Sequence, residues 1–372
     1  MTQSERLIAG AMSGTSGDGV DVAIVGITGT GSQMSARLLH HHHVPFDTSI
    51  RQILFAIRDT QQLKLSDLAT LGREISLTYA RAVNEALAQK HLHANNLAAI
   101  AAHGQTLYHD PPNTIQWFDP ALVAAEVGCA VISDFRRADC AAGGQGAPLV
   151  PFADYILFRH PTKNRVLLNL GGIANITWLP AGASIDQLIA FDTGPANCVV
   201  DHLMNHTVDE GGKLASQGAA HQQMLRQLMQ QEYFQRSPPK STDGPEMIAI
   251  YGRIESRYLK DLTLLTDRLA TACALTAESV VKAIERWCPS PADEVIASGG
   301  GTKNAAIMSS LRRRLGEVPL HTTDELGVKS DAKEAIAFAL LGAATLDGVP
   351  SNVPSVTGAR RALVLGSITP KP

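Results

Sequence analysis

Cysteine is scarce in this sequence, and the few cysteines present are not clustered. The 372 residues include five of them, Cys129, Cys140, Cys198, Cys273 and Cys288, with no Cys-x-x-Cys pair. An odd and dispersed set argues against a disulfide framework and against a cysteine zinc site. The opening residues, MTQSERLIAGAMSG, also lack the apolar core of a secretion signal. We therefore expect reduced thiols and a cytoplasmic protein.

Long apolar runs and an excess of basic charge are missing as well. The most apolar segment, AIAFALLGAATL, is interrupted by Gly342 and ends at Asp347, whereas a membrane-spanning helix needs roughly 18 apolar residues. Lysine and arginine total 32 against 35 acidic residues, so no basic field exists to attract nucleic acid. With 45% apolar and 18% charged residues, the sequence predicts a globular protein that binds neither membrane nor nucleic acid.

The order of the expected elements predicts two related domains. The runs RLIAGAM, VDVAIVGIT and ARLLHHHHV, separated by glycine turns, predict three antiparallel strands, and NRVLLNL, GGIAN and ITWLP repeat this opening later. We expect an α/β fold of two duplicated domains around a central cleft. The first covers 1–138 with a return at 359–372, and the second covers 139–358. Expected helices cover 219–231, 247–266, 267–287, 303–315 and 330–347, with a strand at DEVIASGG.

Three glycine-rich segments are candidates for nucleotide binding. In SGTSGDGVD the glycines let backbone N–H groups approach an anion, and Thr15 and Ser16 add hydroxyl donors. Asp18 and Asp21 on the same turn could hold a hydrated Mg²⁺. The other segments are LNLGGIANIT, with Asn169, Gly171, Gly172 and Asn175, and ASGGGTKN, with Gly299, Gly300 and Gly301. Each could instead be an ordinary turn, and the phosphate motifs of P-loop proteins, dinucleotide-binding domains and protein kinases are absent.

Asp192 is the strongest candidate for a catalytic residue. It follows the apolar run LIAF and precedes a Thr-Gly-Pro turn, which places a carboxylate at the end of a buried strand. A carboxylate there could act as a general base toward water or a hydroxyl. The alternative is a helix cap, which is common for aspartate before such a turn.

Further polar residues predict a side of the site that binds a sugar. His103 and Gln105 follow a strand in AAHGQT, Arg136 and Arg137 lie in DFRRAD, and Gln145 lies in GGQGAP. Arginine suits a carboxylate and amides suit sugar hydroxyls, although the arginines could instead pair with Asp134 and Asp139 on the surface. Glu334 opens a long apolar helix, where the helix dipole alone could explain an acid.

The run His40 to His43 has the composition of a metal site. It lies in an expected strand, however, where neighbouring side chains alternate between the two faces. Because metal ligands must converge on one side, we interpret the run as structural.

Seven segments, in order over nearly the whole chain, resemble one family. GAMSGTSGDGVD, AAHGQT, DFRRADCAAGGQGAPLVP, LNLGGIANIT, FDTGPAN, ASGGGTKN and NVPSVTGARRALVLGSI are similar to the anhydro-N-acetylmuramic acid kinases. The resemblance implies the fold of the actin, hexokinase and heat-shock chaperone ATPases. It also implies a homodimer in cell-wall recycling that uses ATP and water to convert 1,6-anhydro-N-acetylmuramic acid into N-acetylmuramic acid 6-phosphate.

The resemblance also implies roles for single residues. The ATP phosphate loop would be Gly14, Thr15, Ser16, Gly17, Asp18, Gly19, Val20 and Asp21, with Mg²⁺ bound beside it. Asp192 would activate water, and the freed O6 would accept the γ-phosphate. Glu334 would orient water or relay a proton, and Arg136 or Arg137 would bind the lactyl carboxylate.

Two segments depart from the family pattern. Trp117 and Phe118 in QWFDPALVA stand where a smaller residue and a glycine are expected, and STDGPEMIAIYG is unusual after Ser-Thr. These departures concern the sugar pocket and one loop on the nucleotide side. The alternative function is another sugar or acyl phosphotransferase of the same fold, which would not need a base that activates water.

Overall fold

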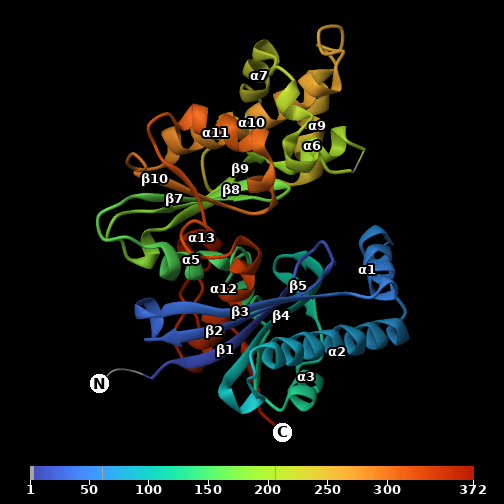
Figure 1. The fold of residues 1–372 in the computed structure, drawn as a ribbon, viewed down its shortest axis with the longest axis vertical. Coiled ribbons are helices and arrows are strands. Elements are labelled where there is room, and N and C mark those ends of the chain that lie inside the picture. Colours follow the sequence, from blue (N-terminus) through green and yellow to red (C-terminus); the bar gives the residue numbers. More distant parts are fainter. Residues whose placement is uncertain (1–3, 61, 206) are drawn as a thin grey trace. The chain divides into compact units, whose positions relative to one another are not determined.

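The computed structural model describes residues 4–60, 62–205 and 207–372, and it divides the chain into two compact units. Unit 1 consists of Met1–Leu157 and Asp331–Pro372, and unit 2 of Phe158–Ser330. Each unit is a sheet covered by helices (Figure 1). In the described residues, no helix is long and apolar enough to cross a membrane.

The sheet of unit 1 has seven strands in the order β12-β6-β4-β1-β2-β3, with β5 paired to β4. Strands β1, β2 and β3 form the expected antiparallel meander, whereas β4 runs parallel to β1 and β6 parallel to β4. The strands are β1 (Arg6–Ser13), β2 (Gly19–Thr28), β3 (Ser35–Pro45), β4 (Leu97–Asp110), β5 (Asn113–Trp117), β6 (Val131–Ser133) and β12 (Ser367–Thr369).

Helices cover both faces of this sheet. Alternate residues of β1 separate the faces, because Ala9 and Ala11 pack in a core with α2, whereas a Cβ on Gly10 would collide with the backbone of Ala335 in α12. Figure 1 shows α2 and α12 on opposite sides of the strands. The helices are α1 (Thr48–Thr60), α2 (Leu65–Gln89), α3 (Pro120–Val127), α4 (Arg137–Ala141), α5 (Val150–Phe158), α12 (Lys333–Leu346) and α13 (Pro354–Thr357).

The sheet of unit 2 has five strands in the order β11-β10-β7-β8-β9. Its core packs the strands against long helices and contains the fully buried Trp178. The strands are β7 (Arg165–Leu170), β8 (Ile173–Leu179), β9 (Ile189–Pro195), β10 (Glu294–Ser298) and β11 (Leu320–Thr322). The helices are α6 (Asn197–Leu203), α7 (Gln222–Met229), α8 (Glu232–Gln235), α9 (Gly244–Glu255), α10 (Leu265–Trp287) and α11 (Ala305–Leu315).

The two sheets share one topology, which confirms the expected duplication. In each, an antiparallel meander of three strands is followed by two parallel strands on the other side of the first, so the strand order is 3-2-1-4-5. Unit 1 adds β5 and β12 to this pattern. The tail strand β12 pairs with β6, so the chain returns to the first sheet as expected.

The units divide the chain at other points than the expected 1–138 plus 359–372 and 139–358. The first division falls after Leu157, and the return begins at Asp331. The reason is the packing of α12 on the first sheet, where a Cβ on Gly342 would come within 2.5 Å of Ala101. Among the expected helices, 247–266 is too long, since α9 ends at Glu255 and α10 begins at Leu265.

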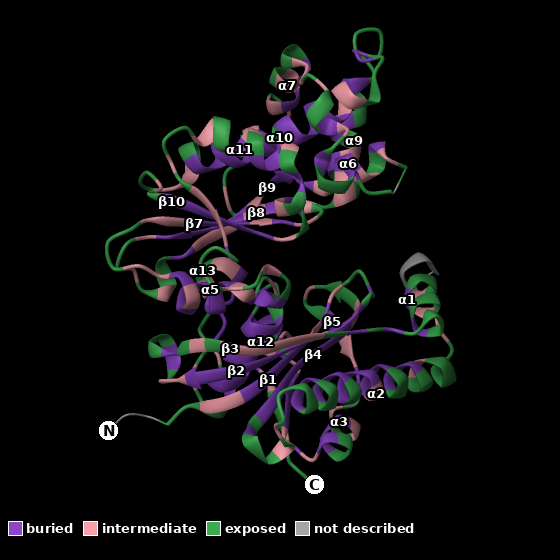
Figure 2. Ribbon diagram, in the orientation of Figure 1, coloured by how far each residue is buried: buried purple, intermediate pink, exposed green. Residues whose placement is uncertain are grey.

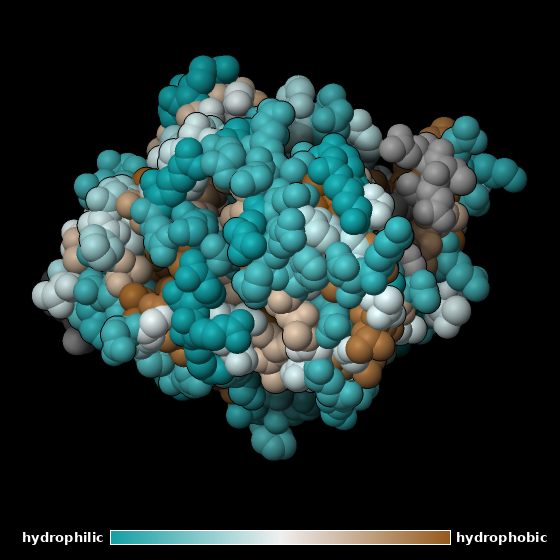
Figure 3. All heavy atoms as spheres, turned by 90° about the horizontal axis from the view of Figure 1, so that it is seen from above, coloured by the Kyte–Doolittle hydropathy of each residue, from teal (hydrophilic) through white to brown (hydrophobic). Residues whose placement is uncertain are grey.

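Burial follows the layers in both units. Figure 2 shows that the central strands are mostly buried, whereas the outer sides of α1 and α2 are exposed. On the face drawn in Figure 3, hydrophilic residues predominate and hydrophobic ones form small separate groups. The exposed apolar residues include Leu65, Val208 and Leu264.

Candidate functional site

Unit 2 aligns three candidate residues in one row across its sheet. Asp192 in β9 pairs with Asn175 in β8, and Asn175 pairs with Asn169 in β7. Directly opposed residues on neighbouring strands point to the same face. Their neighbours Leu168, Leu170 and Phe191 belong to the core beneath the helices, so the polar row lies on the opposite face.

The glycine segments of unit 2 lie against this row. Asn169 also pairs with Ser298 in β10, and Gly299 follows directly. A Cβ on Gly299 would lie 2.8 Å from Oδ1 of Asn169, and one on Gly301 would lie 2.7 Å from Cβ of Leu170. Gly299 has a φ of +88°, which favours glycine on backbone grounds alone. The structure therefore brings the second and third glycine segments together, with no space for a Cβ at Gly299 or Gly301.

The turn of the β7–β8 hairpin, at Gly171 and Gly172, is anchored on the start of α6. The carbonyl of Gly172 accepts hydrogen bonds from the backbone N–H groups of Ala196 and Cys198, and the carbonyl of Gly171 accepts one from Asn197. These contacts fix the position of the hairpin. They also occupy N–H groups at the start of α6, so the hairpin and not this helix terminus is the candidate for phosphate contact.

Asp192 lies within β9, which continues to Pro195, and not past the end of the strand as expected. It caps no helix, because the N-cap of α6 is Ala196. The helix-cap alternative is therefore wrong. Oδ2 of Asp192 accepts a hydrogen bond of 3.0 Å from the backbone N–H of Thr242. Burial raises the pKa of Asp192, while this hydrogen bond and the charge of Lys240 lower it.

Three neighbours of Asp192 were missed by the sequence analysis. Tyr233 donates from its hydroxyl to the carbonyl of Asp192 (2.8 Å), Lys240 accepts at its carbonyl from the Asp192 N–H (3.2 Å), and Thr242 binds the carboxylate. They follow Asp192 by 41 to 50 residues and form no motif with it. The unusual segment after Thr242 starts α9, where Asp243 accepts a hydrogen bond from the N–H of Glu246 as the N-cap.

In unit 1, the loop before β2 is a tight glycine turn. The N–H of Gly17 donates to the carbonyl of Gly14, and Gly17 has a φ of +63°. Nε2 of Gln105 donates to the same carbonyl at 3.1 Å, which ties the AAHGQT segment to the loop. Thr15, Ser16 and Asp18 are exposed, whereas Val20 is buried in the core. The polar residues of this loop that were predicted to bind the nucleotide or Mg²⁺, Thr15, Ser16 and Asp18, are thus exposed.

Asp21 is held by histidines of the neighbouring strand. Its Oδ1 lies 2.9 Å from Nε2 of His41 and 3.2 Å from Nδ1 of His43. His40 and His42 point to the other face, where they contact Gln89 and Glu85 of α2. The expected alternation of the run is therefore confirmed. In the described part of the chain, no three His, Cys, Asp or Glu side chains are grouped to hold a metal ion.

His103 and Gln105 are buried polar residues on β4. Nε2 of His103 accepts a hydrogen bond of 3.0 Å from Nε of Arg136, which assigns the proton to Nδ1. Burial, with the charge of Arg136, lowers the pKa of His103 well below its ordinary value, so the ring is neutral. Within the described residues, Nδ1 of His103 and Oε1 of Gln105 have no hydrogen-bond partner. A buried donor and a buried acceptor left in this way suit the hydroxyls of a ligand.

The two candidate arginines differ in their surroundings. Arg136 donates from Nη1 to the carbonyl of Gly146 (2.8 Å) as well as to His103, and burial lowers its pKa. Arg137 is exposed and pairs with Asp134 at 2.8 Å. The surface ion pair weighed as an alternative therefore applies to Arg137, which is not brought to the other candidates. Gln145 is also exposed, with its backbone N–H bound to the carbonyl of Thr357.

Glu334 lies in the first turn of α12, on the same side of the sheet as Asp21. The residue is exposed, yet partial loss of water around its carboxyl raises the pKa of Glu334. The negative charges of Asp21 and Asp18 raise this pKa as well, whereas the positive charges of Lys333 and Arg136 lower it. The charges of Asp18 and Asp21 in the loop, and of Arg136, therefore act on Glu334. Next to it, Nζ of Lys333 forms a buried ion pair with Asp154 at 2.9 Å.

The departures at Trp117 and Phe118 are absorbed by packing. Nε1 of Trp117 donates to the carbonyl of Leu68, and its ring lies over Gly72 of α2. Phe118 stacks on Tyr79 with ring centroids 5.5 Å apart. Both side chains therefore extend the contact with α2.

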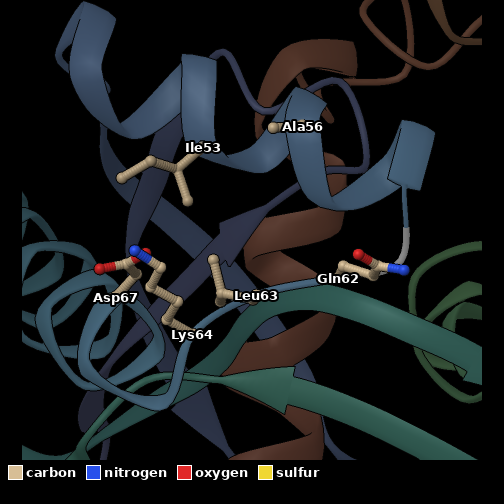
Figure 4. A pocket seen from close by; sticks show the side chains of 6 residues that line it. All are labelled: Ile53, Ala56, Gln62, Leu63, Lys64 and Asp67. Atoms are coloured by element: carbon tan, nitrogen blue, oxygen red, sulfur yellow. The ribbon is translucent and has the colours of Figure 1, made fainter.

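A cavity of about 750 Å³ lies elsewhere in unit 1, between α1 and the start of α2. Figure 4 shows Ile53 and Ala56 on α1 above Leu63, Lys64 and Asp67. The residues that line it include no member of the candidate sets. The case for the site therefore rests on the aligned strand residues and not on this cavity.

The duplicated 3-2-1-4-5 sheets, with a glycine turn after the first strand of each, define an actin-like ATPase fold. The pattern of the anhydro-N-acetylmuramic acid kinase family matches residues 6–371. Anhydro-N-acetylmuramic acid kinases of Salinibacter ruber, Caldanaerobacter subterraneus and Gloeobacter violaceus are 39%, 36% and 38% identical to this chain, covering 99%, 99% and 98% of it and 97%, 98% and 98% of their own lengths. The chain belongs to the anhydro-N-acetylmuramic acid kinase family.

Solved structures of other families are distant in sequence. Component A of the (R)-2-hydroxyglutaryl-CoA dehydratase of Acidaminococcus fermentans aligns with a TM-score of 0.46 at 14% identity, covering 90% of this chain and 96% of its own. The ROK hexokinase of Thermus thermophilus aligns with a TM-score of 0.37 at 14% identity, covering 92% and 99%.

Proposed function

We propose that this protein is an ATP-dependent kinase that opens 1,6-anhydro-N-acetylmuramic acid with water and phosphorylates O6, giving N-acetylmuramic acid 6-phosphate and ADP. Family membership over 6–371 supports this reaction. The single structural observation that carries it is the row Asn169, Asn175 and Asp192, which puts a half-buried carboxylate on the same face of the sheet as Asn169, against which Gly299 packs.

Asp192 is the general base in this proposal. A water molecule that attacks the anomeric carbon must lose a proton, and Asp192 accepts it. The C1–O6 bond breaks, and O6 takes the γ-phosphoryl group of ATP while ADP leaves. The Thr242 N–H on Oδ2 fixes the orientation of the carboxylate. The charge of Lys240 opposes the effect of burial on it.

Residues of unit 1 bind the substrate in this proposal. His103 offers an N–H donor and Gln105 an amide oxygen to sugar hydroxyls, because both atoms are buried without partners in the described structure. Arg136, rather than Arg137, binds the lactyl carboxylate, since its guanidinium is held near His103. Glu334 orients water or relays a proton. Gln145, which is exposed, completes the proposed substrate-binding set, whereas Arg137 is left out of it because it is exposed and pairs with Asp134.

The nucleotide-side residues are the three glycine segments. The polar atoms of Thr15, Ser16 and the loop backbone, with Gly171, Gly172 and Gly299 to Gly301, suit phosphate oxygens. Asp18 and Asp21 fit a hydrated Mg²⁺, because this ion usually takes only one or two carboxylates in addition to phosphates and water, and both histidines bind Asp21 through Oδ1. When bound, Mg²⁺ neutralises charge on the phosphate oxygens.

An isotope experiment tests the reaction. ADP release is measured with ATP, Mg²⁺ and 1,6-anhydro-N-acetylmuramic acid, beside N-acetylmuramic acid and N-acetylglucosamine, in ¹⁸O-labelled water. Release with the anhydro sugar alone, and one ¹⁸O at the anomeric carbon of the product, is the expected result. Release with an ordinary sugar and no label at that carbon would identify another sugar phosphotransferase, in which Asp192 deprotonates a hydroxyl.

The setting of the reaction is part of the proposal. The resemblance to the family supports a cytoplasmic homodimer that serves peptidoglycan recycling and amino-sugar catabolism. Light scattering on a size-exclusion column measures the oligomeric state directly, and a mass equal to the 39.6 kDa chain would contradict the dimer.

A further inference from the structure

We propose that Lys240 is a positioning residue for Asp192, which braces the segment that binds the aspartate and places a positive charge next to its strand. This inference rests on the proposed role of Asp192 as a base. It concerns a side chain on a connection between α8 and α9, far from every glycine segment in the sequence.

Lys240 closes a ring of contacts around the backbone of Asp192. The carbonyl of Lys240 accepts from the N–H of Asp192, Nζ of Lys240 donates to the carbonyl of Tyr233 (3.2 Å), and the hydroxyl of Tyr233 donates to the carbonyl of Asp192. Two residues further on, Thr242 binds the carboxylate. The ring therefore fixes both the strand at Asp192 and the donor of its carboxylate.

The ammonium group of Lys240 is in an unusual place for a lysine. Only 8% of the residue is exposed, and Nζ lies 4.7 Å from the ring centroid of Tyr233 and 6.0 Å from that of Phe191. A lysine on a connecting segment usually keeps its charge in water. Here the charge is instead turned inward, over two aromatic faces and next to the strand that carries Asp192.

The charges around the pair determine the direction of the effect. Burial lowers the pKa of Lys240 to about 8, Arg236 and Arg286 lower it as well, and Asp192 raises it. The charge of Lys240 in turn lowers the pKa of Asp192. The charges of Asp192 and Glu246 raise the pKa of Tyr233, and the charge of Arg236 lowers it. Glu246 also accepts a hydrogen bond from the hydroxyl of Thr242. Within this set, Lys240 is the cation that acts on Asp192.

The test is the pH profile of kcat/KM in two variants. Lys240→Gln keeps N–H donors for Tyr233 but removes the charge, so the acid limb that reports Asp192 should move to higher pH. Lys240→Arg keeps the charge and should leave the limb near its original position. A control, Lys282→Gln, removes an exposed lysine of α10 that pairs with Glu285 and should change nothing.

A purely structural role would give a different result. It would lower kcat/KM by the same factor at every pH in both variants, without moving the limb, as we expect for Tyr233→Phe. Coincident limbs in Lys240→Gln and the wild type would overturn the proposal.

A second measurement leaves Lys240 in place. In Asp192→Asn, ¹⁵N NMR titration of Lys240 should give a pKa below that of the wild type, because a negative neighbour is lost. An unchanged Lys240 pKa would also overturn the proposal. The two proposals fail separately: near-normal turnover of Asp192→Asn would remove Asp192 as the base, whereas an inactive Asp192→Asn combined with an unmoved limb would remove Lys240 alone.

Discussion

Arg136 and His103 share a hydrogen bond of 3.0 Å in which the guanidinium donates to Nε2 of the imidazole. The cation thereby holds the ring in one tautomer and keeps it neutral, with its remaining N–H buried and without a partner in the described structure. A catalytic or binding histidine often depends on such a neighbour for its orientation. The arrangement makes Arg136 and His103 a single hydrogen-bonded pair.

Arg136→Lys should raise the KM for the sugar by about 10- to 100-fold, as expected for losing a charged hydrogen bond. Lysine cannot span both His103 and the carbonyl of Gly146, which the guanidinium contacts with Nε and Nη1. The KM for ATP should not change. The neighbouring Arg137→Lys is the matched control, because Arg137 is exposed and pairs with Asp134. Equal effects of the two variants would contradict the assignment.

Asp192→Asn should lower turnover by about 10² to 10⁴, the usual effect of losing a general base. The amide oxygen of asparagine can still accept the N–H of Thr242, so the thermal unfolding midpoint and ATP affinity should stay close to those of the wild type. Steady-state kinetics and calorimetry measure these quantities. Asp261→Asn, an exposed aspartate in the same unit, is the control. Normal turnover in Asp192→Asn would show that Asp192 is not the general base.

Asp18→Ala should raise the Mg²⁺ concentration needed for half-maximal activity by about tenfold or more. Asp18 is exposed and accepts a hydrogen bond from the hydroxyl of Ser16, so its loss should leave the fold unaffected. The readout is a Mg²⁺ titration of activity at saturating ATP. Asp47→Ala, which removes another exposed carboxylate of unit 1, should leave the requirement unchanged. An identical titration for Asp18→Ala would remove this residue from the site.

Glu294 should make the stability of unit 2 depend on pH. Burial raises the pKa of this carboxyl, but Lys163 and Arg165 more than offset it, so its pKa lies below the ordinary 4.5. Because the folded pKa is depressed, the stabilisation is complete above pH 4.5 and is lost as the pH falls through the folded value. Glu294→Gln should therefore remove this pH dependence and cost about 3 kcal/mol, since it leaves Arg165 unpaired in a mostly buried position.

Urea unfolding, followed by the fluorescence of the buried Trp178 in a variant that carries phenylalanine at positions 117 and 287, measures this effect. Glu285→Gln is the control, because Glu285 forms an exposed pair with Lys282. A free energy of unfolding that does not vary below pH 5 in the wild type would be inconsistent with the ion pairs.

Sequence patterns predicted those parts of the candidate site whose residues lie close together in the chain. The glycine turns and the strands around them are recognisable from composition alone, and so is a carboxylate that interrupts an apolar strand, as Asp192 does. The pairing of Asn169 with Asn175 follows from a short hairpin between two strands. The duplication was visible for the same reason, since each half opens with the same order of strands and turns.

Contacts between distant segments were not predicted, because they leave no periodic signal. Tyr233 and Lys240 contact Asp192 although they lie 41 residues or more after it in the chain. The choice between Arg136 and Arg137 depends on which of the two is buried. The boundary between the units was displaced for a similar reason. The face of α12 on the first sheet includes small residues such as Gly342, which allow very close packing, but the apolar sequence of a helix does not show which sheet it packs against.

The chain returns to unit 1 only in its last part, and this has a consequence during protein synthesis. Buried Asp139 binds the side chains of Asn352 and Thr357 through Oδ1, and β12 completes the edge of the first sheet. Unit 2 is one continuous segment, so it is free to fold as soon as residue 330 has left the ribosome. Unit 1 begins first but is completed after unit 2, and Asp139 has neither Asn352 nor Thr357 as a partner until those residues have been synthesised.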